Sequence, residues 1–155
     1  MTRPGAIKLR AEDAEDLAVV AACLQDAIAS LGEMRFEPGE ARFALVVERF
    51  LWEELMTAKP ADTSGLHAVR TGLHFTDVRA VRMRGLDQRR PSEVLELLTI
   101  TSEPRGEATT ISLVFAGGGE IRLEVDRIRA WLSDLEAPHS TKLRPRHRVD
   151  DEAGP

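Results

Sequence analysis

Residues 111–125, ISLVFAGGGEIRLEV, constrain the fold of this 155-residue chain more than any other stretch. Apolar residues alternate with other residues on both sides of AGGG, for example at Leu113 and Phe115 before it and at Ile121 and Leu123 after it. This period of two is typical of strands with one buried face. A glycine loop that cradles a phosphate needs a helix directly after it, because the helix N-terminus supplies free N–H groups. A strand follows here, so the pattern predicts an antiparallel hairpin whose glycines permit the turn.

Two segments have the three- and four-residue spacing of an amphipathic helix. The first begins at an N-cap, Asp13, and its apolar stripe runs to Leu31, with Gly32 just past the end. The second covers about residues 126–136 and follows the last strand directly. We expect this C-terminal helix to cap the sheet. Its apolar stripe is Ile128, Trp131, Leu132 and Leu135, and Trp131 is expected in one core with Ile111, Leu113, Ile121 and Leu123.

Period-two runs bounded by turn residues predict further strands. These runs cover residues 34–36, 42–50, 66–75 and 78–84, and residues 6–9 are a short candidate for a first strand. Residues 93–102 fit a strand or a helix by apolar count, and the β-branched run Thr99–Thr101 favours a strand. The runs 66–75 and 78–84 are separated by Thr76 and Asp77, which predicts a hairpin there. EPRGEA, residues 103–108, is expected to be another turn.

The predicted class is therefore α+β, with an antiparallel sheet of about seven strands, an N-terminal helix and a C-terminal capping helix. Such a sheet would tend to curl, and the outline is similar to a pleckstrin-homology-like split barrel. An open antiparallel sheet with both helices on one face is the alternative. Residues 1–137 are expected to form a single globular domain, and residues 138–155 a mobile tail with few apolar anchors.

Composition limits the classes of partner and the compartment. The net charge of −5 and the pI near 5.4 give the whole molecule no attraction to nucleic acid or anionic lipid, so nucleic acid is the weakest candidate partner. No stretch approaches the roughly 20 apolar residues of a membrane span. The single cysteine, Cys23, fits a reducing compartment, and we expect a cytoplasmic protein.

The sequence offers no catalytic constellation, no metal-ligand spacing and no cofactor motif. The four histidines are scattered: His67, His74, His139 and His147. There is no GxSxG, and Cys23 lies at the edge of an apolar helical stripe, where a half-buried structural residue is expected.

One segment carries a local charge that differs from the rest. Residues 66–90 contain six arginines against two aspartates, a net charge of +4 in a protein of −5. Guanidinium groups bind phosphates and carboxylates, so this segment is a candidate contact for a small anion or an acidic partner. The alternative is a solvated sheet face that pairs with the protein's own carboxylates. The candidate residues are Arg79, Arg82, Arg84, Arg89 and Arg90.

Several stretches together resemble the domain-of-unknown-function 2948 family of bacterial proteins. They are AEDLAVVAACLQDAI, RFALVVERFLWE, VRAVRMRGLD and above all LVFAGGGEIRLEVDRIRAWLSDL, which lie within residues 6–136. The resemblance implies a small cytoplasmic bacterial protein, and it implies no reaction, cofactor or functional residue.

These observations favour a non-catalytic binding or adaptor module. The alternative is a binder of a small molecule or anion, an enzyme included, that uses the arginine-rich sheet face.

Overall fold

A computed structural model describes residues 7–51, 67–136 and 139–140 of the chain. They form one helix, α1 (Ala14–Cys23), two short 3-10 helices, η1 (Leu31–Glu33) and η2 (Pro38–Glu40), and one antiparallel sheet of eleven strands. The strands are β1 (Lys8–Ala11), β2 (Ile28–Ala29), β3 (Met34–Glu37), β4 (Arg42–Phe50), β5 (His67–Phe75), β6 (Val78–Arg84), β7 (Leu95–Arg105), β8 (Ala108–Phe115), β9 (Glu120–Val125), β10 (Ala130–Asp134) and β11 (His139–Ser140).

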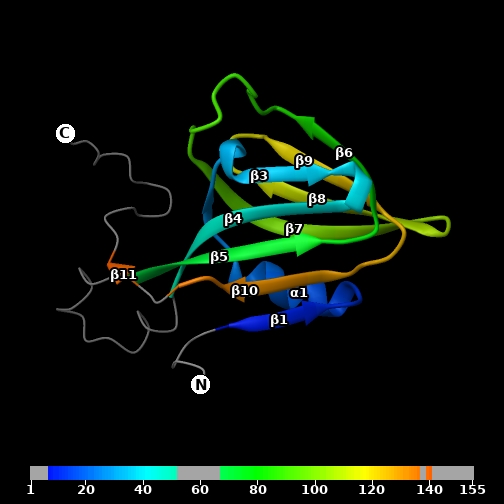
Figure 1. Cartoon of the computed structure of the whole chain (residues 1–155), viewed down its shortest axis with the longest axis horizontal. Helices are drawn as coiled ribbons and strands as arrows, with labels where there is room; N and C mark the ends of the chain where they lie inside the picture. Colours follow the sequence, from blue (N-terminus) through cyan, green and yellow to red (C-terminus); the bar gives the residue numbers. More distant parts are fainter. Residues whose placement is uncertain (1–6, 52–66, 137–138, 141–155) are drawn as a thin grey trace.

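The sheet bends around one main hydrophobic core, beside which Phe50 and Ala68 form a small second cluster. Its strand order is β1-β10-β5-β4-β2-β7-β8-β9-β6, with β3 and β11 added beside β4 and β5. The half that contains β7, β8, β9 and β6 lies behind the half that contains β3, β4 and β5 (Figure 1). The end strands β1 and β6 do not pair with each other in the described part of the chain, so the sheet is open and not a closed barrel. Helix α1 packs against β7 and β1 and covers the core between them.

The glycine-rich turn joins two antiparallel strands, as the sequence predicts. β8 pairs with β9, and the Phe115 N–H donates to the Gly119 carbonyl over 2.9 Å. Gly117 and Gly118 have φ of 89° and 97°, a region that side chains disfavour. The predicted turn at residues 103–108 also joins paired strands, β7 and β8.

The hairpin predicted around Thr76 and Asp77 is wrong. β5 pairs with β4 and β10, whereas β6 pairs with β9. The connection instead carries the chain from one half of the sheet to the other. Asp77 adopts a left-handed conformation with φ of 59°, and the Val78 N–H donates to the Ala41 carbonyl over 2.9 Å. Backbone groups around the turn are thus satisfied by distant segments rather than by a neighbouring strand.

Helix α1 begins as predicted and ends earlier. The Asp16 N–H donates to the Asp13 carboxylate over 2.7 Å, which confirms the N-cap. The helix ends at Cys23 rather than near Leu31. Asp26 has φ of 68° and donates its N–H to the Leu97 carbonyl over 2.8 Å. The chain thus pairs with the start of β7 from Asp26 on and continues as β2.

The predicted C-terminal helix is wrong as well, because residues 130–134 form β10 between β1 and β5. Ala130 and Leu132 point into the core and are fully buried, while Trp131 faces outward and is half-buried. Two neighbouring strands offer backbone partners here, and this tertiary pairing outweighs the helical spacing of the apolar residues. The structure therefore has neither the seven strands nor the capping helix that suggested a pleckstrin-homology-like barrel.

A charged pair lies inside the molecule. The side chains of Arg49 and Asp134 are 2 % and 3 % exposed, and two guanidinium–carboxylate contacts of 3.0 Å join them. The Asp134 carboxylate also accepts from the Thr71 hydroxyl and the Ile7 N–H, each over 2.8 Å. Burial raises the pKa of Asp134, but these hydrogen bonds outweigh it and hold the pKa below its usual range.

Candidate functional site

The arginine-rich segment forms part of the outer face of β6. Arg82 and Arg84 lie on this face, opposite Arg122 and Glu120 of β9. Together with Met83 these residues line a hollow of about 220 Å³. Arg79 lies nearer the start of the same strand, while Arg89 and Arg90 belong to the following loop and do not line the hollow.

Several of these arginines have carboxylate partners. Arg79 pairs with Asp126, and Arg89 pairs with Asp87 over 3.1 Å.

Glu120 sits between two arginines, Arg122 at 2.9 Å and Arg84 at 3.2 Å. The hydrogen bond from Arg122 holds the pKa of Glu120 below its usual range. Arg82 forms no ion pair with any described residue and lies directly opposite Arg122, so two positive charges adjoin. Such a pair can accept a phosphate or carboxylate between its guanidinium groups.

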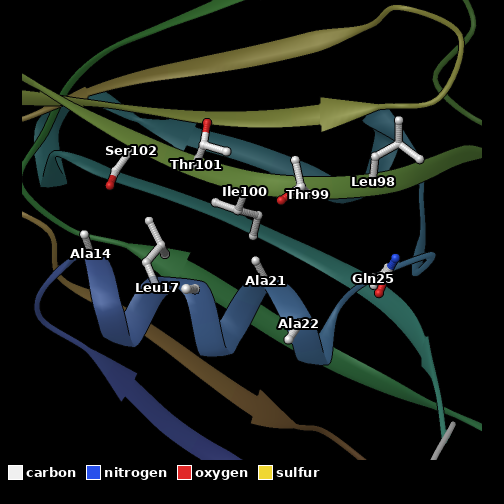
Figure 2. Close-up of a pocket in the computed structure, with 11 residues that line it drawn as sticks. Ala14, Leu17, Ala21, Ala22, Gln25, Leu98, Thr99, Ile100, Thr101 and Ser102 are labelled. Atoms are coloured by element: carbon white, nitrogen blue, oxygen red, sulfur yellow. The ribbon is translucent and has the colours of Figure 1, made fainter.

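A larger groove of about 610 Å³ is lined by α1 and β7 (Figure 2). The helix side presents Ala14, Ala18 and Ala22, all small and exposed. The opposite wall is the β7 stretch Leu98–Ser102. Sequence reasoning missed this groove because it assigned a longer helix and could not place that helix beside β7.

One edge of β7 is unpaired along the groove. β2 pairs with Leu95 and Glu96, and the backbone of Asp26 and Ala27 bonds to Leu97. From residue 98 to 105, β8 is the sole strand paired with β7 within the described ranges. In an antiparallel strand, alternate residues direct their N–H and C=O groups to each edge, so between Leu98 and Ser102 this edge presents backbone donors and acceptors that no described strand pairs with.

A third hollow, of about 600 Å³, lies on the outer face of β3, β4, β5 and β10. Trp131 and His74 stack there with ring centroids 4.9 Å apart and an interplanar angle of 11°. The Arg129 guanidinium lies over the Trp131 ring, 5.6 Å from its centroid. Burial and the charge of Arg42 lower the pKa of His74, so its imidazole is neutral at pH 7. The alternation of Trp131 with the buried Ala130 and Leu132 was the available sequence signal for this position.

A family model matches residues 7–147, most of the chain, and its description is Protein of unknown function (DUF2948). The chain belongs to the DUF2948 family. No curated protein and no solved structure matches it. The family description carries no activity, so the chemistry of this DUF2948 chain has to be inferred from its own geometry.

The groove of the DUF2948 chain is built for contact rather than for proton transfer. Its walls carry alanine, leucine, isoleucine, hydroxyl and amide side chains and no ionisable group. Across the described residues, no three histidine, cysteine, aspartate or glutamate side chains converge as metal ligands. None of the helices in the described ranges has the length and apolar character needed to cross a membrane.

The two sequence segments that contribute the walls of the groove are acidic. Residues 11–34, which include α1, contain six acidic residues and no lysine or arginine. Residues 91–104, which include most of β7, contain Glu93, Glu96 and Glu103 and again no basic residue. The groove therefore favours a partner with positive charge outside its contact segment.

Proposed function

We propose that this DUF2948 chain is a non-catalytic binding module that takes up an extended peptide segment in the groove between α1 and β7. The observation that carries the proposal is the unpaired edge of β7 beside that groove. An extended segment at the usual inter-strand spacing of about 4.8 Å would pair with this edge as an added strand. We further propose that the module acts in the bacterial cytoplasm, where Cys23 would stay reduced.

The side chains of the groove limit what the segment can carry. Ala14, Ala18 and Ala22 leave space between helix and strand that larger side chains would fill. Leu98, 43 % exposed at the end of the groove, offers an apolar contact. We expect a segment of four or five uncharged residues in the groove, with lysine or arginine on its flanks to complement the two acidic segments.

A displayed library of random peptides tests the proposal. Selection on the wild-type protein should enrich segments with the pattern described above, and synthetic copies should bind in solution. Ala18→Trp would fill the groove from an exposed helix position and should weaken binding by about tenfold or more. Val19→Trp is the matched control, because Val19 is 54 % exposed on the same helix and does not line the groove.

Equal binding of the selected peptides to the wild type and to Ala18→Trp would contradict the proposal. So would a selection in which no peptide is enriched. Circular dichroism spectra of both variants should match that of the wild type, which separates loss of the groove from loss of the fold.

The arginine face is the second candidate function, as a site for a small anion or an acidic partner. Its supporting observation is Arg82, which faces Arg122 and has no carboxylate partner among the residues that the structure describes. Under this hypothesis Arg82→Glu plus Arg84→Glu should leave the fold intact and abolish binding of inorganic phosphate and of an oligoglutamate peptide. Retention of both ligands by the folded double variant would end the hypothesis.

A further inference from the structure

Five outward-facing residues form one row across the half of the sheet that carries Trp131. The register aligns Arg10 of β1 with Trp131 of β10, Trp131 with His74 of β5, His74 with Ala44 of β4, and Ala44 with Arg35 of β3. The row thus places a small residue between an imidazole and a guanidinium group.

The stacking of Trp131 on His74 leaves the second face of the imidazole turned toward β4. Ala44 lies next to it there, and a methyl group is too short to cover the ring. Adjacent strands lie about 4.8 Å apart, so His74 and Arg35 stand about 10 Å from each other. That width admits one flat ring between two flat groups. The hollow of about 600 Å³ on this face is lined by Arg35, Ala44, His74 and Trp131 among others.

Charge around the hollow favours an anionic ligand. Arg35 is 76 % exposed and its contact with Glu37 is long, at 3.7 Å. Glu37 is also bound by Arg42 over 2.9 Å, and Glu33 on the rim is bound by Arg70. Lys8 of β1 and Arg129, just before β10, add positive charge near the hollow, whereas Arg10 of β1 is paired with Glu12 over 3.3 Å.

We propose that this hollow is a binding site for a planar heteroaromatic ring that carries a carboxylate or phosphate group. The ring stacks on the open face of His74 above Ala44, and Arg35 binds the acidic group. The site is separate from the α1–β7 groove and does not depend on the peptide proposal.

Two-dimensional NMR of the full chain tests the site through the indole N–H signal of Trp131. Trp131 is one of two tryptophans, and a Trp52→Phe variant assigns its signal. The probes are adenosine 5′-monophosphate and quinoline-2-carboxylate, with ribose 5-phosphate as the probe that has an acid but no ring. Both ring-bearing probes should shift the signal in a saturable manner, and ribose 5-phosphate should leave it in place.

The affinities of variants in this hollow for the probes give the decisive comparison. Ala44→Leu places a branched side chain where the ring would lie. It should lower the affinity for both ring-bearing probes by about tenfold or more. Ala80→Leu, the same change on the outer face of β6, should bind as the wild type does. Arg35→Gln should lower the affinity for quinoline-2-carboxylate to that for uncharged quinoline.

Three results would overturn the assignment. The first is the absence of any saturable shift with both ring-bearing probes. The second is unchanged affinity in a folded Ala44→Leu variant. The third is binding of a single-stranded oligonucleotide without binding of adenosine 5′-monophosphate, which would point to a macromolecular ligand instead.

Discussion

At the scale of single residues, the AGGG turn shows why three successive glycines are needed. Gly117 and Gly118 occupy backbone conformations with positive φ. Gly119 has an ordinary φ, but a Cβ atom there would collide with the Leu86 side chain. Two of the glycines therefore serve the turn itself, and the third permits the loop after β6 to pack against it.

The turn gives a direct test in one pair of variants. Gly118→Ala should lower the free energy of unfolding by about 1–2 kcal/mol, because a side chain disfavours φ of 97°. Gly39→Ala is the control: a Cβ atom there meets nothing within 4 Å and the backbone needs no positive φ. Chemical denaturation measures both, and equal stability of the two variants would be inconsistent with a strained turn.

The buried pair of Arg49 and Asp134 is the second residue-scale feature with a measurable consequence. Asp134→Ala leaves the Arg49 charge without its carboxylate and should cost about 3–5 kcal/mol. Asp126→Ala removes a carboxylate of an exposed pair with Arg79 and should cost at most about 1 kcal/mol. A cost for Asp134→Ala as small as that for Asp126→Ala would show that the pair is solvated.

The same pair predicts how the free energy of unfolding depends on pH. Because the pKa of Asp134 is depressed below its ordinary value of 3.8, the carboxylate stabilises the fold fully above that pH. The contribution is lost as the pH falls through the lower, folded-state pKa. Below about pH 3.8 the free energy of unfolding should therefore fall more steeply in the wild type than in Asp134→Asn. Parallel urea titrations at several pH values measure this, and identical slopes would contradict it.

At the scale of elements, local sequence pattern predicts a strand well when its partner is close in the chain. The hairpin from β8 to β9 and the bounds of β4 follow from alternation and turn residues. Alternation also gives the bounds of β6, but not its pairing with the distant β9. It fails at β10, which has helical apolar spacing and yet is a strand between β5 and β1. The early end of α1 has the same origin, because pairing with β7 takes over at Asp26.

The orientation of β10 can be measured by comparing two neighbouring truncations. Leu132 is fully buried, so Leu132→Ala should cost about 2–5 kcal/mol. Trp131 lies half-buried on the outer face, and Trp131→Ala should cost about 1–2 kcal/mol, mainly through its stacking partners. Guanidinium denaturation measures the free energy of unfolding of both variants. A larger decrease for Trp131→Ala than for Leu132→Ala would place the indole in the core.

The candidate sites show the same division between local and distant information. Alternation places Arg82 and Arg84 on one face, and the structure has both in the same hollow. The adjoining Arg122 depends on the pairing of β6 with β9, which no local pattern contains. The groove needs both the short α1 and the unpaired length of β7, so it could not be foreseen from either segment alone.

At the scale of the whole molecule, opposite charges gather on different surfaces. Acidic residues without basic neighbours are concentrated in residues 11–34 and 91–104, the segments that include α1 and most of β7, whereas arginines gather on the outer face of β6 and β9. Within the described ranges β7 beyond Leu97 and the end strand β6 each have an unpaired edge, and the β7 edge is the one that borders a groove. An exposed edge is a template for another strand, which is a reason to expect a partner there. Peptide capture at β7 is consistent with both the edge and the charge.

Amide hydrogen exchange along β7 tests this central claim most directly. In the free protein, alternate amides between residues 98 and 103 point away from β8 and should exchange fast, while those bonded to β8 are protected. Pro104 has no amide hydrogen and is not a probe. Addition of a peptide selected on the groove should slow exchange at those fast amides and leave the β8-bonded set unchanged. If the peptide binds but exchange at the fast amides of residues 98–103 does not slow, strand addition at this edge is contradicted.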